Sequence, residues 1–175
     1  MDWYSAVFEL IDMRSFSNLW FWIALAVVWS TTSHWIVGVP YDMVQRAQRH
    51  GGEAEADLED LVRINCNRLL YIAGTAGLWL VGLGAAILTS LALLGFYYRV
   101  EFAQAVFLLA APMSIVGFLS VNTALAIRNK DLRGEALRKR MLRHRLYTQI
   151  VGMFAIFVTA LWGMYQNMAI GALGG

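Results

Sequence analysis

The residues with the clearest capacity for chemistry are a run of hydroxyl side chains and a histidine inside an otherwise apolar stretch. The run contains Ser30, Thr31 and His34, and residues 30 and 34 share a helical face because they are four positions apart. Such a group could bind a quinone ring, a haem or a lipid headgroup. Alternatively, the hydroxyls bond to their own helix backbone and His34 bonds to a neighbouring helix. We take Ser30, Thr31 and His34 as candidate cofactor-binding residues.

Metal and haem chemistry has few ligands available in this chain. The histidines are His34, His50 and His144, whereas bis-histidine haem ligation needs two imidazoles that face each other at similar depth. Cys66 is the single cysteine, which excludes an internal disulfide and a site built from several cysteines. We therefore predict no catalytic residue, no metal site and no resident cofactor, and expect that the protein is not an enzyme.

The distribution of charge along the chain predicts the helices that carry these residues. Four stretches of 26 to 30 residues contain no Asp, Glu, Lys or Arg, and each can cross a bilayer core of about 30 Å once as a helix. The charged segments between them are too short to fold a soluble catalytic domain. The sequence predicts an all-α polytopic membrane protein, one membrane domain over residues 1–175, with four transmembrane helices. The expected spans are about 17–38, 69–96, 103–127 and 146–171.

The basic residues predict the orientation of these spans. Twelve Lys and Arg residues lie in the two longer connections, 39–68 and 128–145, and only Arg14 and Arg99 lie on the other side. Because basic residues are retained in the cytoplasm, both connections are expected there, with the N- and C-termini in the periplasm of a bacterial inner membrane. The spans contain no charged side chain, so proton- or ion-coupled transport lacks its usual carriers.

The first thirteen residues are predicted to form a short helix in the outer membrane interface. Asp2, Ser5, Glu9 and Asp12 recur at helical spacing and leave an apolar opposite face. These acidic residues stand where a signal peptide would be basic, so the segment is not expected to be a leader. The alternative is a frayed terminus.

The two connections carry opposite charge. The first has an acidic cluster over 53–60, in a helix expected to begin after Gly51 and Gly52, with Glu59 four residues before Arg63. The second is basic and largely helical, and it can pair with the acidic cluster or contact anionic lipid headgroups. No nucleic-acid module accompanies the charge. The residues assigned to lipid-headgroup contact or loop pairing are Arg138, Lys139, Arg140 and Arg143.

Two helices offer surface for protein contacts. The second span has small residues four apart, Ala73 with Gly77 and Gly82 with Ala86, which allow a second helix to approach closely. The first span has more tryptophan than a four-helix core can hold, so Trp22 and Trp29 are expected to face lipid or a partner. The predicted partner contacts are Trp22, Trp29, Gly77 and Gly82.

The run DWYSAVFELIDMRSFSNLWFWIALAVVWSTTSHWIVGVPYDMV, together with VRINCNRLLYIAG at 62–74, resembles a family of small bacterial inner-membrane proteins. Members of that family often carry an automatic label as components of the Suf iron–sulfur assembly complex. The resemblance implies a membrane protein that works with a larger complex and assigns no residue a chemical role.

The leading functional hypothesis is therefore a non-enzymatic accessory, structural or assembly subunit of a larger inner-membrane complex. The first alternative is a small bundle that binds a quinone, haem or lipid near His34. The second is the helical subunit of a transporter, similar to the small subunit of tripartite periplasmic transporters, although the predicted outside N-terminus argues against it.

Overall fold

A computed structural model describes residues 15–171, and the interfacial helix predicted at 1–13 lies outside this range. The chain is almost entirely helical. In order, its elements are the 3-10 turn η1 (Ser15–Ser17), α2 (Leu19–His34), β1 (Trp35–Ile36), β2 (Val39–Pro40), α3 (Tyr41–His50), α4 (Gly52–Ala92), the π-helical turn η2 (Leu93–Tyr97), α5 (Glu101–Asn129) and α6 (Gly134–Gly171).

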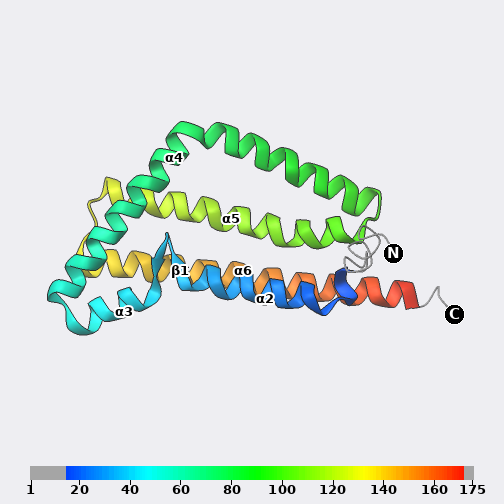
Figure 1. The fold of residues 1–175 in the computed structure, drawn as a ribbon, viewed down its shortest axis with the longest axis horizontal. Helices are drawn as coiled ribbons and strands as arrows, with labels where there is room; N and C mark the ends of the chain where they lie inside the picture. Colours follow the sequence, from blue (N-terminus) through cyan, green and yellow to red (C-terminus); the bar gives the residue numbers. More distant parts are fainter. Residues whose placement is uncertain (1–14, 172–175) are drawn as a thin grey trace, which may run out of the picture.

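The long helices run side by side along one axis. Figure 1 shows α2, α5 and α6 in this direction, with the first part of α4 crossing one end of the molecule and α3 leading into it. We call this end, formed by α3, the start of α4 and the α5–α6 turn, the charged end. Three helical segments are long and apolar enough to cross a membrane: Gly52–Tyr97, Glu101–Asn129 and Gly134–Met168.

The first predicted span is shorter than expected. The prediction of a helix over 17–38 is wrong at its end, because α2 stops at His34 and a hairpin follows in which Ile36 pairs with Val39. Its two turn residues, Val37 and Gly38, have φ of 51° and 75°, as a tight two-residue hairpin turn requires. The 16 residues of α2 reach only about 24 Å, less than the roughly 30 Å of a bilayer core.

The larger core lies at the charged end, outside the most apolar stretches. It joins the hairpin, α3, the start of α4, the end of α5 and the start of α6, and its fully buried side chains include Val39, Val44, Leu58, Val62 and Met141. A smaller cluster around Leu25 and Trp29 joins α2 to α5 and α6. Most of the specific packing is therefore formed by segments that carry charge on their opposite faces.

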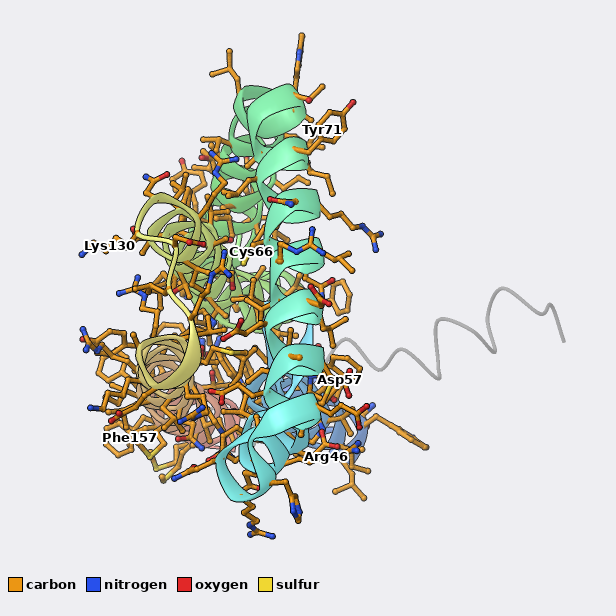
Figure 2. All side chains as sticks on the ribbon, turned by 90° about the vertical axis from the view of Figure 1, so that its left-hand side faces the viewer. Arg46, Asp57, Cys66, Tyr71, Lys130 and Phe157 are labelled. Atoms are coloured by element: carbon orange, nitrogen blue, oxygen red, sulfur yellow. The ribbon has the colours of Figure 1, made fainter. Side chains whose placement is uncertain are left out.

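Helix α4 changes role along its length. Gly51 and Gly52, both with positive φ, break the chain as predicted, and α4 begins well before the apolar stretch. Its first part crosses the charged end as far as Tyr71, with Cys66 on the side of the other helices (Figure 2). Its second part then runs back alongside α5 (Figure 1), and the most apolar window of this segment has no buried residue.

Candidate functional site

The three candidate cofactor-binding residues lie on the outer side of α2. Ser30, Thr31 and His34 are all exposed, and the His34 ring contacts only the edge of Trp35 among described aromatic rings, with 6.1 Å between centroids. Their neighbour Thr32 faces the bundle instead. Its hydroxyl lies 3.7 Å from Sδ of Met113 on α5, and it also donates to the Val28 carbonyl of its own helix at 2.7 Å. The structure therefore does not enclose the predicted group in the bundle interior.

A different histidine is buried. His144 of α6 is 4% exposed, and its Nδ1 lies 3.1 Å from Oγ1 of Thr123 on α5. Nη2 of Arg140 reaches the same hydroxyl at 3.5 Å. This contact joins α5 to α6 at the charged end. A polar side chain within an apolar helix often forms such an interhelical hydrogen bond. Within residues 15–171, no group of three or more His, Cys, Asp or Glu side chains is arranged to hold a metal ion.

Protonation of His144 should weaken the fold. The residue lies in the charged first part of α6, before the uncharged stretch that starts at residue 146. Burial, and then the positive charge of Arg140, lower the pKa of His144 below its ordinary 6.5. The unfolded chain then binds a proton near pH 6.5 while the folded chain does not, so stability is complete above this pH and is lost as the pH falls towards the folded pKa.

We expect the Tm in mild detergent to be lower at pH 5.5 than at pH 7.5, and His144→Gln to reduce this difference. Glutamine can still bond to Thr123 but does not titrate. His34→Gln is the matched control, because His34 is exposed and should leave the difference unchanged. An equal fall in Tm for wild type and His144→Gln would contradict the assignment.

The acidic and basic connections meet at the charged end. Nη1 of Arg138 forms an ion pair with Oε1 of Glu55, both mostly buried, and Oε1 of Glu59 accepts a hydrogen bond of 2.7 Å from the backbone of Gly134. Because an ion pair of limited exposure is less screened than a surface pair, these contacts tie α4 to the start of α6. Arg138 thus forms an ion pair between the two connections.

The other predicted pairing residues behave differently. Lys139 pairs within α6 with Glu135 at 2.7 Å, and Arg143 is exposed. The prediction of a Glu59–Arg63 ion pair is wrong. Arg63 instead pairs with Asp60 at 3.1 Å, because the Glu59 carboxylate is used by the backbone of α6.

Sequence reasoning missed the contribution of α3. The Tyr41 ring at its start lies under the Arg145 guanidinium, 3.6 Å from the ring centroid, a cation–π contact that joins α3 to α6. Val44 and Ala47 are buried beside it. The signal was present, since Tyr41, Val44 and Ala47 recur every three residues as on one helical face.

A second polar contact group lies at the opposite end of the molecule. The Gln104 side chain of α5 is 2% exposed, and its amide donates to the Gly95 carbonyl at 2.8 Å. Its Oε1 accepts from Nε1 of Trp162 at 2.9 Å and from Nε2 of Gln166. Gln104 therefore joins η2, α5 and α6. No sequence pattern distinguishes it from other polar residues near the end of a span.

The predicted partner contacts divide between the interior and the surface. Trp29 is only 4% exposed and packs on Gly152 of α6, so its assignment as a partner contact is wrong. Trp22 is half-buried and donates to the Phe16 carbonyl at 3.1 Å. Gly77 and Gly82 remain open, because a Cβ atom added at either would meet nothing within 4 Å.

The described polar contacts therefore act mainly between helices. The side chains of His144, Arg138 and Gln104 each form a hydrogen bond or ion pair with a residue of another helix. No family model, curated protein or solved structure matches this chain.

Proposed function

We propose that this chain crosses a bacterial inner membrane four times and is a non-enzymatic accessory or assembly subunit of a larger membrane complex. The observation that carries the proposal is the uncovered apolar part of α4. No residue of its most apolar window is buried within the chain, whereas α5 and α6 both contribute residues to the packed clusters. A span whose apolar window has no buried residue has a free surface for another protein.

The proposed occupant of this surface is a transmembrane helix of a different subunit. Lipid tails and helices are equally apolar, so apolarity alone does not favour a protein partner. Small residues do, because they let two backbones approach closely. Gly77 and Gly82 are open in this way, and the flanking Leu78 and Trp79 are among the most exposed side chains of the chain, at 86% and 81%.

Although α2 alone is shorter than a bilayer core, η1 and the hairpin extend the chain at its two ends, and the contacts there support a fourth crossing. Oγ of Ser17 donates to Oδ1 of Asn167 at 2.8 Å, which places the start of α2 beside the end of α6. The hairpin that follows α2 belongs to the core of the charged end. We propose that the charged end is cytoplasmic, because it carries most of the basic residues. In a Cys66→Ser background, a cysteine at Lys130 should then react with an impermeant thiol reagent only from the cytoplasmic side.

Replacing Gly77 and Gly82 by larger residues tests the subunit proposal. The wild-type chain, purified in mild detergent after cross-linking, is expected to form a complex of fixed stoichiometry with an identified membrane protein. Gly77→Leu with Gly82→Leu should abolish this complex and leave the Tm of the chain itself nearly unchanged, since neither site has a neighbour within 4 Å. Phe157→Leu, on the exposed side of α6 (Figure 2), is the control that should keep the complex.

Three results would contradict the proposal. They are a lone monomer with no cross-linked partner, a pure homodimer, or a partner retained by the double glycine variant.

A further inference from the structure

A cavity of about 420 Å³ lies where the charged end meets the apolar helices, between the end of α2, the hairpin, α4 and α5. Its volume is within the range of roughly 300–1,000 Å³ that small-molecule sites occupy. It is separate from the group at His34, Ser30 and Thr31, none of which lines it. The lining residues used below are Thr32, Asn65, Arg68, Ile72, Val116 and Ser120.

The cavity has a polar end and an apolar end. On α4, Asn65 and Arg68 precede Ile72, so the polar pair lies nearer the charged end. On α5, which runs in the opposite direction, Ser120 follows Val116. Both helices therefore place polar groups towards the charged end and apolar groups towards the middle of the molecule, which matches a headgroup and an acyl chain.

Arg68 is the single charged residue in the cavity lining. It is exposed, and none of the ion pairs formed among the described residues includes it. It is also the last basic residue before the uncharged stretch of α4. A guanidinium at this depth favours a phosphate, which it can bind through two parallel hydrogen bonds.

The other polar groups offer acceptors. The Ser120 hydroxyl donates to the Val116 carbonyl at 2.9 Å, as Thr32 does within α2. The Asn65 amide nitrogen donates to the Gly38 carbonyl at 3.2 Å. The lone pairs of the two hydroxyls and Oδ1 of Asn65 remain to accept hydrogen bonds, so a ligand that carries both a phosphate and hydroxyl donors fits better than one with acceptors only.

We propose that this cavity binds an anionic glycerophospholipid with a hydroxylated headgroup, of the phosphatidylglycerol type. The phosphate binds Arg68, the headgroup hydroxyls donate to Asn65 and Ser120, and one acyl chain lies along Ile72 and Val116. A quinone has only acceptor oxygens, and phosphatidylcholine has no headgroup donor and no net charge, so both fit less well. This lipid site does not depend on whether the protein is an accessory subunit.

Native mass spectrometry of the delipidated full chain in mild detergent tests the proposal with phosphatidylglycerol or phosphatidylcholine of identical acyl chains. Phosphatidylglycerol is expected to bind in a one-to-one adduct and more tightly than phosphatidylcholine. Arg68→Gln should weaken that binding about five- to tenfold, which is the affinity that one basic residue usually contributes at an anionic membrane surface. Arg63→Gln, on the same helix but paired with Asp60 and outside this cavity, should bind as wild type does.

A second variant reports on the cavity independently of charge. Gly117 lines it, and a Cβ atom there would meet nothing within 4 Å, so Gly117→Leu should fill the space without disturbing the fold. It should lose the phosphatidylglycerol adduct while its Tm stays close to that of wild type. Equal binding of the two lipids, or wild-type binding by both Arg68→Gln and Gly117→Leu, would overturn the site.

Discussion

Gly152→Ala is expected to destabilise the protein by about 1–3 kcal/mol, the usual cost of overpacking a core. A Cβ atom at this position would lie 2.8 Å from Cε3 of Trp29 and 3.2 Å from Cδ2. Both atoms belong to a rigid ring that is almost fully buried, so neither can move aside cheaply. The expected result is a lower Tm in mild detergent and a loosened α2–α6 contact.

Two comparisons separate this effect from a general response to alanine. Gly84→Ala, on the exposed part of α4, should be neutral or slightly stabilising, because nothing lies within 4 Å and alanine favours a helix over glycine. In a Trp29→Leu background the cost of Gly152→Ala should largely disappear. A cost that stays the same without the Trp29 ring would show that the two residues do not interact as described.

Gln104→Leu is expected to lower the free energy of unfolding by about 2–4 kcal/mol, because it leaves one buried and two partly buried polar groups without their partner. Those groups are the Gly95 carbonyl, Nε1 of Trp162 and the Gln166 amide. Gly95 is also so close to α5 that its Cβ atom would lie 2.9 Å from the Gln104 backbone nitrogen. Loss of the side-chain bond should therefore loosen η2, and with it the turn between α4 and α5.

The free energy of unfolding can be measured in mild detergent with increasing denaturing detergent. Asn122→Leu is the matched control, because Asn122 is an exposed amide on the same helix and should change stability little. The loss in the free energy of unfolding for Gln104→Leu combined with Trp162→Phe should be smaller than the sum of the losses for the two single variants. Strict additivity would contradict the Gln104–Trp162 bond.

Several features of the fold could be predicted because they depend on local chemistry. Gly51 and Gly52 end α3 and begin α4 since both adopt positive φ. The early start of α4 follows from the apolar spacing of Leu58 and Val62, which are both buried. Of the polar residues within the third and fourth apolar stretches, Thr123, Gln166 and Asn167 bond to other elements, whereas Asn122 is exposed.

Other features depend on which helix meets which. The sequences around His34 and around Arg68 are equally suitable for a binding site. In the structure, Ser30, Thr31 and His34 lie on the outer side of α2. The cavity instead forms between the hairpin, α4 and α5, where Thr32 and Arg68 line it. The number of tryptophans in the first span predicts Trp29 at the surface, because a four-helix core cannot hold all of them. Gly152, 123 positions later, provides the space that buries it.

Composition and local spacing are enough to predict the helical class, the apolar segments and the clustering of charge between them. The short α2, the larger core at the charged end and the uncovered apolar part of α4 depend instead on which helices pack together. The physical reason is that a leucine in lipid and a leucine against another helix have nearly the same environment. Hydrophobicity therefore identifies a membrane helix without identifying its neighbours, which are selected by small residues, buried hydrogen bonds and a few ion pairs.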